Sequence, residues 1–367
     1  MKILNIVKYY EPCQGGMESV VKNIVEGIVD ISKDVVFSIY SNNHIRKFKK
    51  EISNKDRITI IKETTPFYLK SQPLNVRYPA LKKLIDDHDI IHHHYPFPTM
   101  EISLLKNIKR LSNKKFVITW HANIKNSRWS WIERFYNPMI KKLLDRADCI
   151  IVTSPQLYEA SSILIHYKDK IKVIPLSFDP KYKISQAKKQ PLNRSFELLF
   201  VGKLRKYKGV EYLIKAIENL PVNLTIVGNG EELEILKEQV KKIGIQERIS
   251  FITNATDDEL SEIYKKSDLF ILPSINEAEA FGVVQLEAMA NGLPVINTYL
   301  DSGVPFVSLN DFSGITVAPK SSEDIRSAIA RIIESKELYE KFSLNAIERS
   351  SLFTRKKMSE SYLDLYK

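Results

Sequence analysis

The chain has 367 residues, of which 44% are apolar and 27% are charged. One hydrophobic core rarely spans more than about 250–300 residues, so we expect two domains. No apolar run approaches the roughly 18–20 residues of a membrane helix, and the first residues, MKILNIVKYYEP, have no signal-peptide cleavage site. Cys13 and Cys149 lack metal-ligand spacing, which predicts free thiols and a cytoplasmic protein.

The positive charge is concentrated in one half of the chain. Residues 1–195 contain 34 Lys and Arg against 18 Asp and Glu, whereas residues 196–367 contain 21 against 26. A basic half favours an anionic partner, namely a phosphate-bearing acceptor, an anionic membrane surface or nucleic acid. A solvated Lys-rich face with no partner is the alternative.

Short apolar strands alternate with helical segments through the first half. We expect strands at 2–7, 35–40, 89–95, 115–120, 149–154 and 172–176, and helices at 17–31, 99–111, 129–146 and 156–166. This alternation is typical of a parallel sheet with helices on both faces.

A polar, irregular stretch then marks a domain boundary, and the alternation of strands and helices begins again after it. Further strands are expected at 197–202, 223–228, 248–253, 268–274, 293–298 and 314–319. We therefore expect an α/β protein with two doubly wound, Rossmann-like domains facing each other across a cleft, with ligands at the carboxyl ends of the strands. The expected division is residues 1–175, a linker at 176–195, residues 196–353, and a C-terminal helix at 354–367 that packs back on the first domain.

The segment 271–298, ILPSINEAEAFGVVQLEAMANGLPVINT, is the most specific feature of the sequence. A buried strand ends at Ser274, Glu279 lies in the loop, and a helix is expected to begin near Phe281–Gly282. A helix start suits a diphosphate, and Gly282 permits close approach to the backbone. Glu279 and Glu287 would then lie on either side of that diphosphate and accept hydrogen bonds from ligand hydroxyls. The alternative is that the acids merely favour the helix dipole.

The run from Glu279 to Glu287 (EAFGVVQLE), followed by AMANGLPV, resembles the Glu-x7-Glu signature of the family-four retaining glycosyltransferases, which have the GT-B fold. The resemblance implies that Glu279 contacts hydroxyls of the transferred sugar and that Glu287 holds the ribose of the donor. It also implies that Phe281, Gly282 and Val283 belong to the donor site.

A cationic loop follows the first strand of the second half, in LLFVGKLRKYKGVEYL. Cations beside a helix start would neutralise a departing diphosphate. The loop is similar to the basic loop of the same family, with Lys208 at the family's lysine. Lys203 stands where arginine is commoner, and a lysine lacks the bidentate fork. Arg205 either compensates for this or is a solvated loop charge.

In the first half, Gly15 and Gly16 separate the first strand from its helix, and no GxGxxG is present, which argues against a dinucleotide site. The resemblance implies that this loop reaches the donor phosphates and the acceptor. His121, in ITWHANI, follows a strand end, and the resemblance places a histidine here beside the reacting sugar. A histidine satisfied by the backbone is the alternative.

The run His92-His93-His94 invites a metal interpretation. Side chains alternate along a strand, so His92 and His94 should share one face and His93 the other. Two ligands on one face bind zinc only with further partners; we expect His94 to line the cleft. Asp87-His88-Asp89 is interpreted as a turn. We expect that the protein uses no metal ion and no cofactor, and that its donor binds as a substrate.

Segment 125–146 combines Trp129 and Trp131 with basic residues, which suits a lipid-phosphate acceptor or a membrane surface, although much of its helical spacing also suits a core. The whole chain is similar to bacterial mannosyl- and rhamnosyl-type transferases of polysaccharide assembly. That resemblance implies a nucleotide sugar donor, with GDP-mannose first and deoxyhexose or UDP-sugars as alternatives. It also implies a lipid-linked acceptor, peripheral binding at the inner membrane face, and no nucleic acid.

Two alternatives stay open from the sequence. An epimerase of sugar nucleotides or a phosphorylase would use the same architecture; the epimerase needs no acceptor and the phosphorylase needs inorganic phosphate. A basic membrane- or nucleic-acid-binding module would explain the charge of the first half but not the Glu-x7-Glu block.

Overall fold

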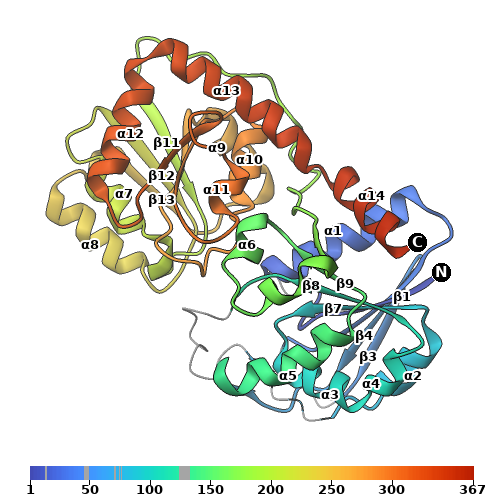
Figure 1. Cartoon of the computed structure of the whole chain (residues 1–367). Coiled ribbons are helices and arrows are strands. Elements are labelled where there is room, and N and C mark those ends of the chain that lie inside the picture. Colours follow the sequence, from blue (N-terminus) through green and yellow to red (C-terminus); the bar gives the residue numbers. More distant parts are fainter. Residues whose placement is uncertain (13–14, 45–48, 70–71, 74, 76, 124–132) are drawn as a thin grey trace. The chain divides into compact units, whose positions relative to one another are not determined.

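The structure is a computed structural model that describes the chain except residues 13–14, 45–48, 70–71, 74, 76 and 124–132. It contains two compact units (Figure 1). The first comprises Met1–Leu176 and Arg355–Lys367, and the second comprises Ser177–Thr354. No helix in the described ranges is long and apolar enough to cross a membrane. Cys149 is a free, buried thiol, and Cys13 lies outside the described residues.

The first unit is built on an eight-stranded sheet in the order β10-β9-β8-β7-β1-β2-β4-β3. Its described neighbours run parallel except β3 and β4, and β5 pairs antiparallel with β6 in a separate ribbon. The strands are β1 (Lys2–Ile6), β2 (Val36–Asn42), β3 (Glu51–Lys55), β4 (Ile58–Glu63), β5 (Tyr68–Leu69), β6 (Gln72–Pro73), β7 (Ile90–Tyr95), β8 (Lys115–Trp120), β9 (Cys149–Val152) and β10 (Ile171–Val173).

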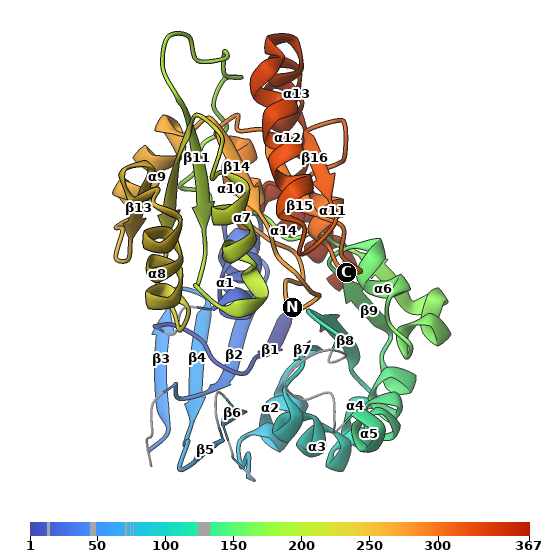
Figure 2. The same cartoon turned by 90° about the vertical axis from the view of Figure 1, so that its left-hand side faces the viewer.

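Helices cover both faces of this sheet, as Figure 2 shows, with α2 to α5 on one face and α1 with α14 on the other. An ion pair of 2.7 Å between Arg355 of α14 and Asp30 of α1 joins the two helices of the second face. The helices are α1 (Gly16–Ile31), α2 (Leu81–Asp87), α3 (Pro98–Lys106), α4 (Ile108–Leu111), α5 (Glu133–Arg146), α6 (Pro155–Glu159), the 3-10 helix η2 (Leu164–Lys170) and α14 (Arg355–Tyr366).

The second unit contains a six-stranded sheet in the order β13-β12-β11-β14-β15-β16, and its paired strands are parallel. The strands are β11 (Phe196–Val201), β12 (Val222–Val227), β13 (Ile249–Ile252), β14 (Leu269–Leu272), β15 (Val295–Thr298) and β16 (Gly314–Val317). The helices are η3 (Lys206–Lys208), α7 (Val210–Ala216), α8 (Leu233–Ile243), η4 (Gln246–Arg248), α9 (Asp257–Lys266), α10 (Val284–Ala290), α11 (Val304–Val307), α12 (Ser322–Glu334), α13 (Lys336–Ser350) and η5 (Ser351–Phe353).

Each sheet reverses its strand order at one place. In the second unit the chain moves outward from β11 through β12 to β13, and then returns to the other side of β11 with β14. The first unit reverses in the same way between β1 and β7. Loops leaving the carboxyl ends of the two strands at such a point diverge and leave a crevice for a ligand. The loops after β11 and β14, and those after β1 and β7, are therefore the places to look for a site.

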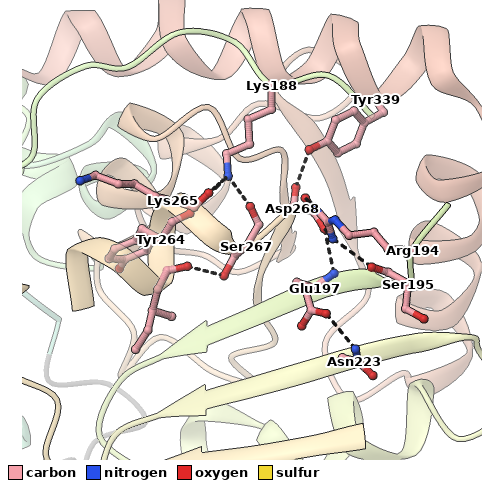
Figure 3. Close-up of polar contacts among 11 residues, drawn as sticks. Lys188, Arg194, Ser195, Glu197, Asn223, Tyr264, Lys265, Ser267, Asp268 and Tyr339 are labelled. Carbon is pink, nitrogen blue, oxygen red and sulfur yellow. Dashed lines mark hydrogen bonds and ion pairs between the residues drawn. The ribbon is translucent and has the colours of Figure 1, made fainter. Parts of the chain in front are cut away.

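The polar segment 176–195, which the sequence suggests as a linker, is hydrogen-bonded to the second unit (Figure 3). Lys188 donates to the backbone oxygens of Lys265, at 2.6 Å, and Ser267, which belong to the end of α9. Arg194 forms two hydrogen bonds, of 2.6 and 2.7 Å, with the carboxylate of the buried Asp268. The carboxyl-terminal part of the segment is thus part of the second unit.

Several elements differ from the sequence expectation. One helix was expected over 99–111 and no strand between 41 and 88, whereas the structure has α3 and α4 in the first range and β3 to β6 in the second. The helix expected over 156–166 is divided, because α6 ends at Glu159 and the Ser161 hydroxyl accepts a hydrogen bond from the Leu164 backbone N–H, which starts the new helix η2. The edge strand β3 was not expected, since it is mostly exposed and polar and carries no apolar alternation.

Candidate functional site

The second unit brings two predicted site residues into contact at its switch point, the place between β11 and β14 where the strand order of the sheet reverses. The loop after β11 carries Lys208 and the loop after β14 carries Glu279, and the Lys208 ammonium forms an ion pair with Oε2 of Glu279. The Ser274 hydroxyl donates to the same oxygen at 3.1 Å. The two charged side chains keep 9% and 11% of their surface exposed. The pair is therefore nearly buried, with about a tenth of each side chain left at the surface.

The Lys208 ammonium keeps its charge although it is nearly buried. Burial is the strongest single influence on Lys208 and acts against its ammonium, but the attraction of Glu279 and Tyr207 and the hydrogen bond to Glu279 together outweigh it, so the pKa of Lys208 is raised. A cation and an anion thus lie side by side at the edge of the sheet. Such a pair offers one group to phosphate oxygens and the other to sugar hydroxyls.

Gly209 allows the cationic loop to reach β14. Its φ is +64°, and a Cβ added there would lie 2.2 Å from the backbone oxygen of Pro273. A larger residue would push the loop, and Lys208 with it, away from Glu279. Lys203 and Arg205, which precede it in the loop, are exposed to solvent.

The helix after β14 begins two residues later than the sequence predicts. Gly282 has a φ of +74°, which a helical residue cannot adopt, and α10 starts at Val284 behind the partly exposed Val283. Phe281 is buried and packs against the rings of Phe306 and Phe353. The expectation of a helix beginning at Phe281–Gly282 is thus wrong, and the ring of Phe281 faces the core, so only its backbone is left to meet a ligand.

Glu287 lies in the first turn of α10, and its carboxylate is held from a neighbouring helix. The hydroxyl of Tyr264 in α9 donates to Oε2 of Glu287 at 2.8 Å. Burial is the main cause that raises the pKa of Glu287, to about 7. Its charge is therefore sensitive to pH near neutrality.

In the first unit a line of hydrogen bonds runs across strand ends at the switch point. Nδ1 of His94 lies 2.9 Å from Nε2 of His121, and Nε2 of His94 lies 3.0 Å from Oδ1 of Asn5. With the Asn5 oxygen accepting, His94 carries its proton on Nε2 and accepts from His121. His121 then keeps Nδ1 as an acceptor. Burial lowers the pKa of His121 to about 3, so its ring is neutral at pH 7.

The neighbouring histidines have structural partners. His92 contacts the Tyr366 hydroxyl at 2.6 Å and the Thr119 hydroxyl at 2.7 Å, while His93 lies 3.0 Å from Glu101. The rings of His92 and His94 are 4.2 Å apart between centroids, which confirms that these two share a face. Within the described residues no group of three or more His, Cys, Asp or Glu side chains is placed to hold a metal ion.

The remaining predicted residues are placed only in part. Gly15 caps the start of α1, and Gly16, its first residue, is exposed. Trp129 and Trp131 lie outside the described residues. Their assignment to the acceptor stays a prediction.

Three residues at these sites were not found from the sequence. Ser274 was seen only as a strand end, although a polar residue that ends a buried strand at a switch point is a usable signal. Asn5 interrupts the apolar first strand and is completely buried, which is the same kind of signal. Tyr264 occupies an ordinary helical core position, and nothing in the sequence singles it out.

Solved structures share this architecture along the whole chain. Sucrose-phosphate synthase from Thermosynechococcus elongatus matches with a TM-score of 0.77 and 21% identity, over 100% of this chain and 98% of the other. HepE from Anabaena, in complex with UDP, matches with a TM-score of 0.75 and 19% identity, over 100% and 99%. The fold is therefore that of the GT-B glycosyltransferases, with two parallel-sheet α/β domains.

Sequence comparison identifies the family. The model for Glycosyltransferase Family 4 matches residues 14–182 and the model for Glycosyl transferases group 1 matches residues 183–349. The chain is also 26% identical to the O-antigen chain mannosyltransferase C of Escherichia coli, over 100% of this chain and 98% of that protein. It is 26% identical to the D-rhamnosyltransferase WbpZ of Pseudomonas aeruginosa, over 96% and 92%. The chain belongs to the family-4 glycosyltransferases and is a glycosyltransferase.

Proposed function

We propose that this protein is a retaining glycosyltransferase that moves a hexose from a nucleotide diphosphate sugar to a lipid-linked oligosaccharide during assembly of a bacterial surface polysaccharide. The observation that carries the proposal is the nearly buried pair of Lys208 and Glu279 at the switch point. The relatives named as O-antigen mannosyltransferase and D-rhamnosyltransferase support this assignment. GDP-mannose is the first donor to test.

The donor is held by the second unit. Lys208, with Lys203 beside it, meets the diphosphate and stabilises the charge that develops on the leaving group. Glu279 accepts hydrogen bonds from hydroxyls of the transferred sugar, and Glu287 accepts them from the ribose. The backbone around Gly282 approaches the phosphates. These cations take the part that a divalent ion plays in other transferases, so the reaction needs no metal.

The first unit supplies the group beside the reacting carbon. His121 is neutral, and in the tautomer set by His94 its Nδ1 accepts a hydrogen bond from a sugar hydroxyl. The acceptor attacks from the face that the diphosphate leaves, a course that needs no carboxylate nucleophile. Configuration at the anomeric carbon is then retained.

The acceptor is lipid-linked, and the protein works at the cytoplasmic face of the membrane as a peripheral protein. Residues 1–195 contain 34 Lys and Arg but only 18 Asp and Glu. This positive charge supports both the lipid-linked acceptor and the membrane location, because basic surfaces bind anionic lipid headgroups and phosphates. Gly15, Trp129 and Trp131 are assigned to the acceptor side, and Gly16 to the donor phosphates.

The decisive experiment is a thermal-shift screen against GDP, UDP and dTDP, followed by product analysis with the matching sugar nucleotide. A ligand that binds the folded state raises the unfolding temperature by mass action. A shift with one of the three, and transfer only when an acceptor is present, supports the proposal. Conversion of the donor without acceptor indicates an epimerase, dependence on inorganic phosphate indicates a phosphorylase, and no shift with any nucleotide contradicts the donor site.

A further inference from the structure

The carboxylate of Glu287 is positioned by one buried tyrosine. Tyr264 of α9 has no exposed surface, and its hydroxyl donates to Oε2 of Glu287 at 2.8 Å. The Tyr264 ring is fixed by an edge contact with Tyr182, with centroids 5.5 Å apart, and by a tilted contact with Phe270 at 6.4 Å. Because the ring cannot turn away, its hydroxyl occupies a set direction at Oε2.

Several groups decide whether Glu287 is charged. Burial raises the pKa of Glu287 to about 7, the hydrogen bond from Tyr264 and the ammonium of Lys181 lower it, and Asp179 and Asp257 raise it. Lys181 is itself paired with Asp257 at 2.7 Å, so its charge is largely compensated. The Tyr264 hydroxyl is therefore the chief group that opposes the effect of burial.

The charge of Glu287 matters for a ribose. An ionised carboxylate only accepts hydrogen bonds, and it can accept several. It can therefore receive the 2′- and 3′-hydroxyls of GDP or UDP, or the single 3′-hydroxyl of dTDP, while still bonded to Tyr264. Protonation turns one of its oxygens into a donor and removes the stronger, charge-assisted bonds. The neutral form thus binds a nucleoside diphosphate more weakly than the ionised form.

We propose that Tyr264 is a positioning residue that favours the ionised form of Glu287 and thereby sets the pH range in which this chain binds a nucleoside diphosphate. This inference rests on the proposed function, because it takes Glu287 to be the ribose contact. Tyr264 does not itself touch the nucleotide; it acts through the carboxylate.

The test uses the full chain and its Tyr264→Phe variant, which removes a single oxygen atom. The probe is whichever of GDP, UDP or dTDP binds the wild type at about pH 8.5, and its affinity is measured by calorimetry from about pH 5.5 to about pH 9.5. Wild-type affinity should fall as the pH drops through about 7. In Tyr264→Phe the fall should begin about one pH unit higher, which makes binding at pH 7 about fivefold weaker. Affinity should return near the wild-type value at about pH 9, where Glu287 is ionised in both proteins.

Tyr339→Phe is the matched control. Tyr339 is also completely buried in the second unit, but its hydroxyl donates to the backbone oxygen of Asp268 at 3.2 Å (Figure 3). Its removal should leave the pH dependence of binding unchanged. The ionisation of the nucleotide itself is common to all three proteins and cancels in the comparison. A Tyr264→Phe curve that coincides with the wild type, or that stays weak at high pH, overturns the proposal.

Carbon NMR of the Glu287 carboxyl, assigned with Glu287→Gln, separates this inference from the proposed function. The titration midpoint of the carboxyl should lie near 7 in the wild type and higher in Tyr264→Phe. Equal midpoints overturn the role of Tyr264 whatever the nucleotide does. If no nucleotide binds the wild type at any pH while the midpoints differ, the proposed donor site fails and with it the functional part of the inference, but not the effect of Tyr264 on Glu287.

Discussion

Replacing Lys208 by Met should destabilise the second unit because it leaves Glu279 as an unpaired, nearly buried charge. Removing one partner of a buried ion pair costs about 3–5 kcal/mol. Each side chain keeps about a tenth of its surface exposed, so we expect the lower end, about 3 kcal/mol. Glu279→Gln should cost a similar amount, since it leaves the Lys208 ammonium without its carboxylate. The double variant removes both charges and should come within about 1 kcal/mol of the wild type.

Chemical denaturation of the wild type, the two single variants and the double variant measures this coupling. Transfer activity is measured on the same four proteins. Loss of preorganised electrostatic stabilisation lowers kcat about 100-fold or more, so all three variants should be nearly inactive. The double variant is the informative one, because it should be stable and still inactive. Lys206→Met, an exposed change in the same loop, is the control.

Two results would refute the reasoning. Costs of the single changes that simply add in the double variant would mean that Lys208 and Glu279 do not interact in solution. A double variant with full transfer activity would remove this pair from the donor site. Activity lost only in proportion to stability would assign the pair a structural role.

Other perturbations test the surrounding structure. Asn5→Leu should lower kcat about tenfold, the worth of one hydrogen bond, without moving the acidic limb of the pH profile, because burial holds the pKa of His121 at about 3. An unchanged kcat would contradict a role for the hydrogen bonds that link Asn5 through His94 to His121. Gly209→Ala should lower the free energy of unfolding by about 3 kcal/mol and weaken nucleotide binding. Gly244→Ala is the control: its φ is also positive but the space around it is open, so it should cost about 1 kcal/mol in denaturation. Equal costs would exclude the close approach of Gly209 to Pro273. Arg194→Ala should lower the free energy of unfolding by about 1–2 kcal/mol and leave kcat unchanged. A loss of kcat would show that the ion pair of Arg194 with Asp268 also supports the donor site.

Much of the fold follows from local pattern. The alternation of short apolar strands and helices predicted two parallel-sheet domains, and the strands β7, β8 and β15 lie where that rhythm places them. Backbone detail was less accessible. The start of α10 was expected at Gly282, but the left-handed conformation of that glycine delays the helix to Val284. A single glycine does not reveal which of its conformations the surrounding chain selects.

The same distinction between local pattern and tertiary structure holds for the residues of the candidate site. The sequence by itself determined which loops carry acids, lysines and histidines, because each loop follows a recognisable strand. Only the tertiary structure decided that Lys208 meets Glu279, 71 residues away, that His94 meets Asn5, and that Tyr264 holds Glu287. These pairs depend on which strands and helices become neighbours, and strand order in a parallel sheet is set by the packing of the whole domain and not by local periodicity.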